Sequence, residues 1–157
     1  MLKVILFSCL FFGGNALAES ADQLKAKAEK DEIQKLKDFL VIYRAGAELG
    51  NSGDQFNLGL MYKSGMGTIQ DYKESIKWFR LAAQQGDSRA QAMLGGMYYN
   101  GEGVTQDYRT AHMWLNIASA NGVSHAAEGR DQLAEMMSRE DVDRAQDMAR
   151  EWIKNHP

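Results

Sequence analysis

Cysteine and proline are almost absent from this chain of 157 residues. The only cysteine is Cys9, and the only proline is Pro157, the last residue. One cysteine excludes a disulfide within the chain, so the fold must depend on packing alone. Because proline interrupts a helix from within, its absence before the last position leaves every helix interior intact.

A basic cluster and a strand pattern are also missing. The chain has 18 basic and 21 acidic side chains, for a net charge of −3, and the two signs are mixed along it. Nucleic-acid-binding proteins gather Lys and Arg on one surface, so we exclude nucleic acid as a partner. No segment alternates apolar and polar residues with a period of two, which predicts an all-α chain.

Long apolar runs are missing too, and the longest one lies near the start. The apolar run 4–12 follows Lys3, and an Ala-Leu-Ala pattern ends at Ala18. This order predicts a signal peptide over residues 1–18, cleaved after Ala18, and a periplasmic or secreted chain with no membrane span after cleavage. A membrane anchor would need about 20 apolar residues. A lipoprotein processed at Cys9 would leave almost no apolar region before the cut.

The chain does contain an internal sequence repeat, with a spacing of 36 residues. The stretch 58–62, Leu-Gly-Leu-Met-Tyr, returns at 94–98 as Leu-Gly-Gly-Met-Tyr. A period of 20–50 residues predicts a stack of helical units, which bury their apolar faces against their neighbours. The same spacing also relates Gly65 to Gly101, Gly67 to Gly103, Asp71 to Asp107 and Trp78 to Trp114.

The period divides the chain into units. We expect a flexible or loosely helical lead-in at 19–30, a helix of a degenerate leading repeat at 31–49, full repeats at 50–85 and 86–121, and a degenerate capping repeat at 122–157. Each full repeat is a helix, a glycine-rich loop and a second helix, which ends at a glycine.

Three local features carry specific predictions about these helices. Asp71 and Asp107 are expected to cap the second helix of each repeat. Ser88, with Gln91 three residues later, predicts a capping box at the start of the first helix of the second repeat. Gly59 and its equivalent in the second repeat lie inside helices, where glycine costs about 1 kcal/mol relative to alanine. We therefore expect a close helix–helix contact at both glycines.

Together these motifs resemble the Sel1-like repeat, a subclass of tetratricopeptide-type helical solenoids. The pattern is Leu-Gly-x-x-Tyr, then Gly-x-Gly, Asp-Tyr and a Trp before two small residues. It covers 45–122 strongly, and 31–44 and 123–155 weakly; Thr68 and Ser75 depart from it. The resemblance implies an αα-hairpin solenoid with a helical C-terminal cap. It also implies an exported adaptor that binds a protein or peptide.

The resemblance also implies where such a partner binds. In tetratricopeptide-like arrays the first helix of each pair lines the ligand groove, on the face that the Leu-Gly and Tyr positions leave free. That face also contains Ala92 and Gly96. Phe56 and Leu60 have an alternative role, which is to pack under helix 31–49. The candidate partner-binding residues are Phe56, Leu60, Lys63, Arg89, Tyr99 and Asn100.

No motif indicates catalysis, a metal or a cofactor. The three histidines, His112, His125 and His156, lack the spacing of zinc ligands, and we expect His112 to be at the surface or half-buried without a role. The Gly-x-Gly loops follow helices and carry no Lys-Ser ending, so they are not phosphate loops. We therefore predict no enzyme activity, no catalytic or metal-binding residue and no cofactor.

Three further possibilities concern the role of the chain. It could be a structural or regulatory subunit of a cell-envelope assembly, which needs the same kind of surface. Cysteine-rich exported relatives of this repeat have been classed as β-lactamase-like hydrolases, but no Ser-x-x-Lys occurs here. Two full repeats are short for a free-standing array, so self-association or a partner that completes the stack is a further expectation.

Overall fold

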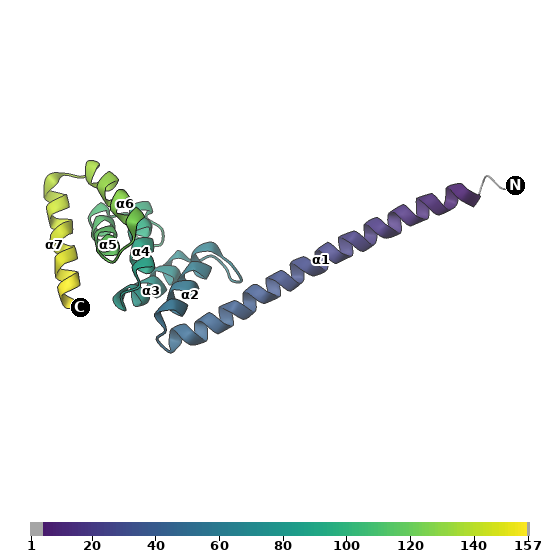
Figure 1. The fold of residues 1–157 in the computed structure, drawn as a ribbon, viewed down its shortest axis with the longest axis horizontal. Coiled ribbons are helices and arrows are strands. Elements are labelled where there is room, and N and C mark those ends of the chain that lie inside the picture. Colours follow the sequence, from purple (N-terminus) through teal and green to yellow (C-terminus); the bar gives the residue numbers. More distant parts are fainter. Residues whose placement is uncertain (1–4, 157) are drawn as a thin grey trace.

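The computed structural model describes the backbone of residues 5–156 and the side chains of residues 22–156. Residues 1–4 of the predicted signal peptide lie outside the described residues, and so do the side chains of the rest of it. The described chain contains seven helices and no strand, which confirms the predicted all-α fold (Figure 1). The helices are α1 (Ile5–Glu48), α2 (Ser52–Ser64), α3 (Tyr72–Gln84), α4 (Ser88–Asn100), α5 (Tyr108–Ala120), α6 (Ser124–Glu135) and α7 (Arg139–Asn155).

Aspartates cap three of these helices. Asp71 and Asp107 each accept hydrogen bonds from two backbone N–H groups in the first turn of α3 and α5, as predicted. The predicted capping box of Ser88 and Gln91 is wrong. Asp87 caps α4 instead, accepting hydrogen bonds from two N–H groups, and Ser88 is the first helical residue. A carboxylate at the cap also interacts favourably with the positive end of the helix, which favours Asp87 over its neighbour.

The glycines inside α2 and α4 allow the two helices of each hairpin to approach closely. A Cβ on Gly59 would lie 2.7 Å from the ring of Phe79 in α3, and a Cβ on Gly95 would lie 2.7 Å from Leu115 in α5. Both distances are shorter than any normal carbon–carbon contact. The predicted close contact at these two positions is confirmed.

The second glycine of each loop lets one unit pack against the helix before it. Gly67 has φ +71°, and a Cβ there would lie 2.6 Å from the carbonyl oxygen of Leu36 in α1. Gly103 has φ +73°, and a Cβ there would lie 2.7 Å from the carbonyl oxygen of Tyr72 in α3. Leu36 and Tyr72 are themselves 36 residues apart. The end of α1 therefore packs on the first unit as α3 packs on the second.

The junctions between units also repeat their hydrogen bonds. The amide of Gln55 donates to the carbonyl of Ala47 at 3.1 Å, and Gln91 donates to Ala83 at 3.3 Å. Arg44 donates to the hydroxyl of Tyr62, and 36 residues later Arg80 donates to that of Tyr98. The two glutamines thus satisfy a carbonyl group near the end of the preceding helix in the same way at both junctions, and the Arg–Tyr hydrogen bonds repeat beside them.

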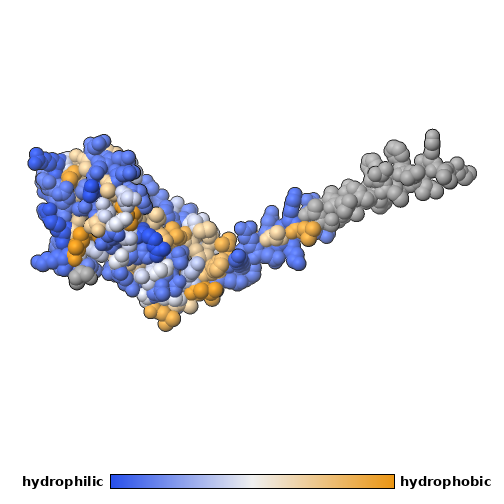
Figure 2. Space-filling view, in the orientation of Figure 1, coloured by the Kyte–Doolittle hydropathy of each residue, from blue (hydrophilic) through white to orange (hydrophobic). Residues whose placement is uncertain are grey.

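The two ends of the array differ. α1 leaves the body as a long rod, and its residues 22–35 are all exposed (Figure 1). The helix runs without a break through 19–30, since this stretch is rich in Ala, Lys and Glu and contains no Gly or Pro. Figure 2 shows apolar surface where α1 meets the body. In this part of the chain, Val41 and Ile42 of α1 are exposed.

The other end is closed by α7. Its buried face, with Ala145 and Ala149, packs on α5, and Trp152 contacts Trp114 edge to face with ring centres 5.4 Å apart. Aromatic pairs of this geometry contribute about 0.5–1.5 kcal/mol beyond the area they bury. The opposite face of α7 is charged and exposed.

Candidate functional site

An apolar cavity opens between α4 and α6, and we call it the groove. Its volume is about 410 Å³. Tyr99 and Met136 lie at its rim and remain 39% and 57% exposed. The other lining residues are Ala92, Met93 and Gly96 from α4, Leu115 from α5, and His125, Gly129, Gln132 and Leu133 from α6.

The groove exists because the second repeat differs from the first at two positions. Ala92 and Gly96 replace Phe56 and Leu60, which occupy the same positions 36 residues earlier. A Cβ built on Gly96 has no described atom within 4 Å other than its immediate neighbours in the chain and helix. Glycine at this position is therefore not needed for packing. It leaves space that the first repeat fills with a leucine.

Tyr99 is the predicted site residue that the structure places in the groove. Its ring stacks on Tyr108 of α5, with ring centres 5.6 Å apart and planes 23° apart. One face of Tyr99 is thus supported while its exposed part borders the groove. A fixed aromatic ring of this kind can bury a large area against a partner without losing much rotamer freedom.

Phe56 and Arg89 form a separate pair outside the groove. Phe56 is 8% exposed and packs on Phe79, with ring centres 5.7 Å apart. The guanidinium of Arg89 lies 4.2 Å from the centre of the Phe56 ring and pairs with Asp87 at 2.6 Å. The hydrogen bonds that the Arg89 guanidinium donates to Asp87 raise the pKa of Arg89 above its usual value. Leu60 is half-buried and packs against the same core as Phe56.

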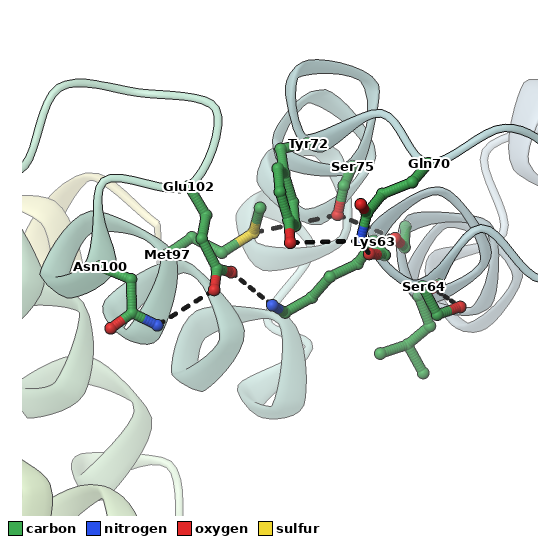
Figure 3. Close-up of polar contacts among 10 residues, drawn as sticks. Lys63, Ser64, Gln70, Tyr72, Ser75, Met97, Asn100 and Glu102 are labelled. Atoms are coloured by element: carbon green, nitrogen blue, oxygen red, sulfur yellow. Dashed lines mark hydrogen bonds and ion pairs between the residues drawn. The ribbon is translucent and has the colours of Figure 1, made fainter.

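Lys63 and Asn100 meet at Glu102, in the loop of the second repeat (Figure 3). The ammonium group of Lys63 pairs with one oxygen of the Glu102 carboxylate, and the amide of Asn100 donates to the other oxygen at 3.1 Å. Lys63 also lies 5.4 Å from the centre of the Tyr72 ring. The charge of Lys63 is therefore neutralised within the chain, and the contact ties the end of α2 to the next loop.

The six predicted residues thus fall into three places. Tyr99 borders the groove. Phe56 and Leu60 pack in the first repeat, where Arg89 of the second repeat lies over the Phe56 ring. Lys63 and Asn100 join the two repeats through Glu102. Sequence reasoning missed the opposite wall of the groove, which α6 supplies. The 36-residue period could have indicated that wall, because it places His125 of α6 at the position that Arg89 holds in α4.

The chemistry of the groove is that of a binding site for an apolar group. Its polar side chains are Tyr99, His125 and Gln132, and none of them is part of a hydrogen-bonded pair of nucleophile and base within the described residues. Residues 22–156 also contain no cluster of three His, Cys, Asp or Glu side chains that could hold a metal ion. Within the described residues, no helix combines the length and the apolar character needed to cross a membrane.

Comparison with known proteins identifies the repeat. The Sel1 repeat family matches residues 54–87 and 88–123. A protective antigen of uropathogenic Escherichia coli strains, c5321, which displays an SLR fold, is similar over 82% of this chain with a TM-score of 0.71 and 28% identity. A Sel1 repeat protein from Oxalobacter formigenes is similar over 56% of this chain with a TM-score of 0.54 and 34% identity.

These two matches are partial with respect to the other proteins. The chain spans 31% of the length of the antigen and 35% of that of the Oxalobacter protein. No match was found among curated proteins. The spacing, the fold and the matched residues all agree, and the chain therefore contains two Sel1 repeats, at residues 54–87 and 88–123.

Proposed function

We propose that this chain is an exported, non-catalytic adaptor that binds a protein or peptide by taking an apolar side chain of the partner into the groove. Sel1 repeat folds are generally scaffolds for protein–protein interaction, and such solenoids are typically not catalytic. The observation that carries the proposal is the open space at Gly96, beside the exposed ring of Tyr99.

The shape and lining of the groove support this proposal. Ligand sites are concave and mostly apolar, with a few polar groups that fix orientation. Here an apolar floor lies between the exposed Tyr99 and Met136, and His125 and Gln132 offer hydrogen bonds at its edge. Large exposed apolar side chains around a cavity are typical of interaction surfaces.

Filling the groove tests its role directly. Peptides selected for binding to the full chain from a random library are expected to share an apolar residue, and to lose affinity for a Gly96→Leu variant by at least about tenfold, since burying one such side chain contributes about 1.5–3 kcal/mol. Gly96→Ala is the matched control. It leaves most of the space open and should bind the same peptides as the unmodified chain.

A second variant separates the groove from the rest of the surface. Tyr99→Ala removes the aromatic rim and should weaken the same peptides, whereas Lys63→Gln, whose charge is already paired with Glu102, should not. Equal binding of the selected peptides by the unmodified chain, Gly96→Leu and Tyr99→Ala would exclude the groove as the site.

The exported location is part of the proposal and has its own test. It is supported by the order of positive residue, apolar run and Ala-Leu-Ala pattern at the start of the chain. Mass spectrometry of the protein purified from a bacterial periplasm is expected to find a mature chain that begins at Glu19. An intact Met1 in all of the material would contradict processing at Ala18.

A further inference from the structure

A second cavity lies between α5, α6 and α7, and a buried histidine faces it. His112 is 1% exposed, so the expectation of a surface or half-buried position is wrong. Its Nδ1 atom is buried and has no hydrogen-bond partner among the described residues. A buried nitrogen without a partner costs about 1–3 kcal/mol, which calls for an explanation in terms of function or of a missing ligand.

The repeat register makes this position unusual. Thirty-six residues before His112 and Arg130 stand Ile76 and Leu94, which are both buried in the apolar core where α3 meets α4. At the next junction, where α5 meets α6, the same two positions hold a histidine and an arginine. Two apolar core positions have thus been replaced by polar residues at this junction, and this replacement does not favour packing.

The replacement creates a polar cavity of about 390 Å³. All three helices contribute to its wall. Its polar lining consists of His112 and Asn116 from α5, Arg130 and Asp131 from α6, and Gln146 and Arg150 from α7. Arg130 donates to the Asn116 side-chain oxygen at 3.3 Å and pairs with Asp131 at 2.7 Å. Arg150 pairs with Asp147, which does not line the cavity.

The charges of the lining favour one negative group. Two arginines and one aspartate line the cavity, and Arg150 also pairs with Asp147 at the surface outside it. Burial and the charge of Arg130 lower the pKa of His112, while Asp131 opposes them. His112 is therefore neutral near pH 7, with one ring nitrogen that donates and one that accepts. A carboxylate placed here would accept hydrogen bonds from the guanidinium groups that line the cavity beside the ring.

We propose that this cavity binds a carboxylate between His112, Arg130 and Arg150. A guanidinium group matches a carboxylate with two parallel hydrogen bonds, and such charge-assisted bonds are about twice as strong as neutral ones. The amides of Asn116 and Gln146 add donors along the same wall. The carboxylate comes either from a small organic acid or from an acidic side chain of a bound protein.

Nuclear magnetic resonance of the histidine ring nitrogens tests the proposal on the full chain. Near pH 7, succinate and, separately, a capped peptide that contains one glutamate are added as probes. The expected result is a saturable change in the His112 ring signals and a rise in the pKa of His112, because a bound anion favours the protonated ring. Binding of succinate alone assigns the site to small acids, and binding of the peptide alone assigns it to a partner's side chain.

Two surface variants keep the test independent of folding. Arg150→Gln removes a side chain that is 69% exposed and should weaken the probe by about tenfold, the loss of one charge-assisted contact. Arg144→Gln, on the same helix but away from the cavity, should bind as the unmodified chain does. No saturable change at His112, equal binding by Arg150→Gln, or tighter binding of inorganic phosphate than of succinate would overturn the proposal.

Discussion

Individual glycines in this chain have opposite roles, although they look alike in the sequence. Gly59 is needed because the ring of Phe79, which is fully buried, occupies the space of its Cβ. Gly96 lies in open space on the groove side of α4. The same substitution is therefore expected to change stability in opposite directions at the two positions.

Replacement of each glycine by alanine measures this difference. Gly59→Ala should lower the free energy of unfolding by up to about 2 kcal/mol, because overpacking costs about 1–3 kcal/mol and the gain in helix propensity recovers about 1 kcal/mol. Gly96→Ala should raise it by up to about 1 kcal/mol, since only the propensity changes. Urea denaturation of both variants provides the measurement, and destabilisation by Gly96→Ala would contradict the open space.

The buried histidine gives the chain a specific dependence on pH. The pKa of His112 is lowered in the folded state, by burial first and then by Arg130, against the opposing charge of Asp131. The unfolded chain, with an ordinary pKa of about 6.5, therefore binds the proton more readily. Stability is expected to fall as the pH drops below about 6.5 and to recover as it rises above that value.

Thermal unfolding between about pH 8 and pH 5 checks this dependence against a His112→Ile variant. This variant restores the residue that Ile76 provides in the first repeat. It should be more stable than the unmodified chain at the acidic end of this range. Its stability should no longer fall as the pH drops through the histidine pKa. Asp107 does not interfere, since hydrogen bonds from Thr110 and Arg109 outweigh burial and lower its pKa, so it titrates in more acidic solution. An unchanged decline in His112→Ile would assign the effect to another group.

At the scale of elements, the loops between paired helices have two distinct glycines. Gly101 ends α4 in the left-handed conformation with φ +72°, and a Cβ there would meet its nearest atoms only at 3.4 Å. Gly103 has a similar φ, but a Cβ there would collide with the backbone of Tyr72 in the preceding unit. The first glycine turns the chain, and the second allows two units to stack.

The two loop glycines are expected to differ in the cost of alanine. Gly101→Ala should lower the free energy of unfolding by about 1–2 kcal/mol, which is the cost of placing alanine in the left-handed conformation. Gly103→Ala adds a clash with backbone that cannot rotate away, so its loss should exceed that of Gly101→Ala by about 1 kcal/mol or more. Chemical denaturation of the pair gives the comparison, and equal losses would show that the unit contact at Tyr72 is loose.

Sequence reasoning reached the elements because each repeated residue has a local physical reason. Leu-Gly and the capping aspartates at 71 and 107 act within one hairpin, so their spacing alone identifies them. It failed at α4, where Asp87 and Ser88 are adjacent and either can cap a helix. It also could not place Lys63, because its contact with Glu102 depends on how a loop of the next unit folds.

The site was less predictable than the fold, for a similar reason. Tyr99 and Gly96 were on the predicted face, but the groove needs a second wall from α6, where the Leu-Gly pair has been lost and the repeat signal is weak. The burial of His112 follows from the register, since Ile76 and Leu40 hold the same position in earlier units. Read by itself, a histidine on a helix gives no sign of that burial.

At the scale of the whole molecule, stability is expected to be distributed unevenly along the chain. Residues 22–35 of α1 are exposed on all sides, whereas the core that joins α2 to α5 is fully buried at Phe79 and Leu94. A helix without tertiary contacts opens readily in water.

Hydrogen–deuterium exchange measures this distribution. Amides of residues 22–35 should exchange within seconds, while those of α3 and α4 should be protected by nearly the full free energy of unfolding. The end of α1, which contacts α2 through Ala47, is expected to behave like the core. Strong protection of 22–35 would mean that another surface, such as a second copy, covers this part of the helix.

The repeated junctions also have a consequence for how such a chain can lengthen. The contact that Gln55 makes with Ala47 on one side of the first unit is the contact that Gln91 makes with Ala83 on the other. A duplicated segment of 36 residues inserted at Asp87 would therefore meet, at both of its ends, surfaces that already fit it. Growth by tandem duplication requires no new interface to evolve, and each added copy is free to change only the residues that face a ligand.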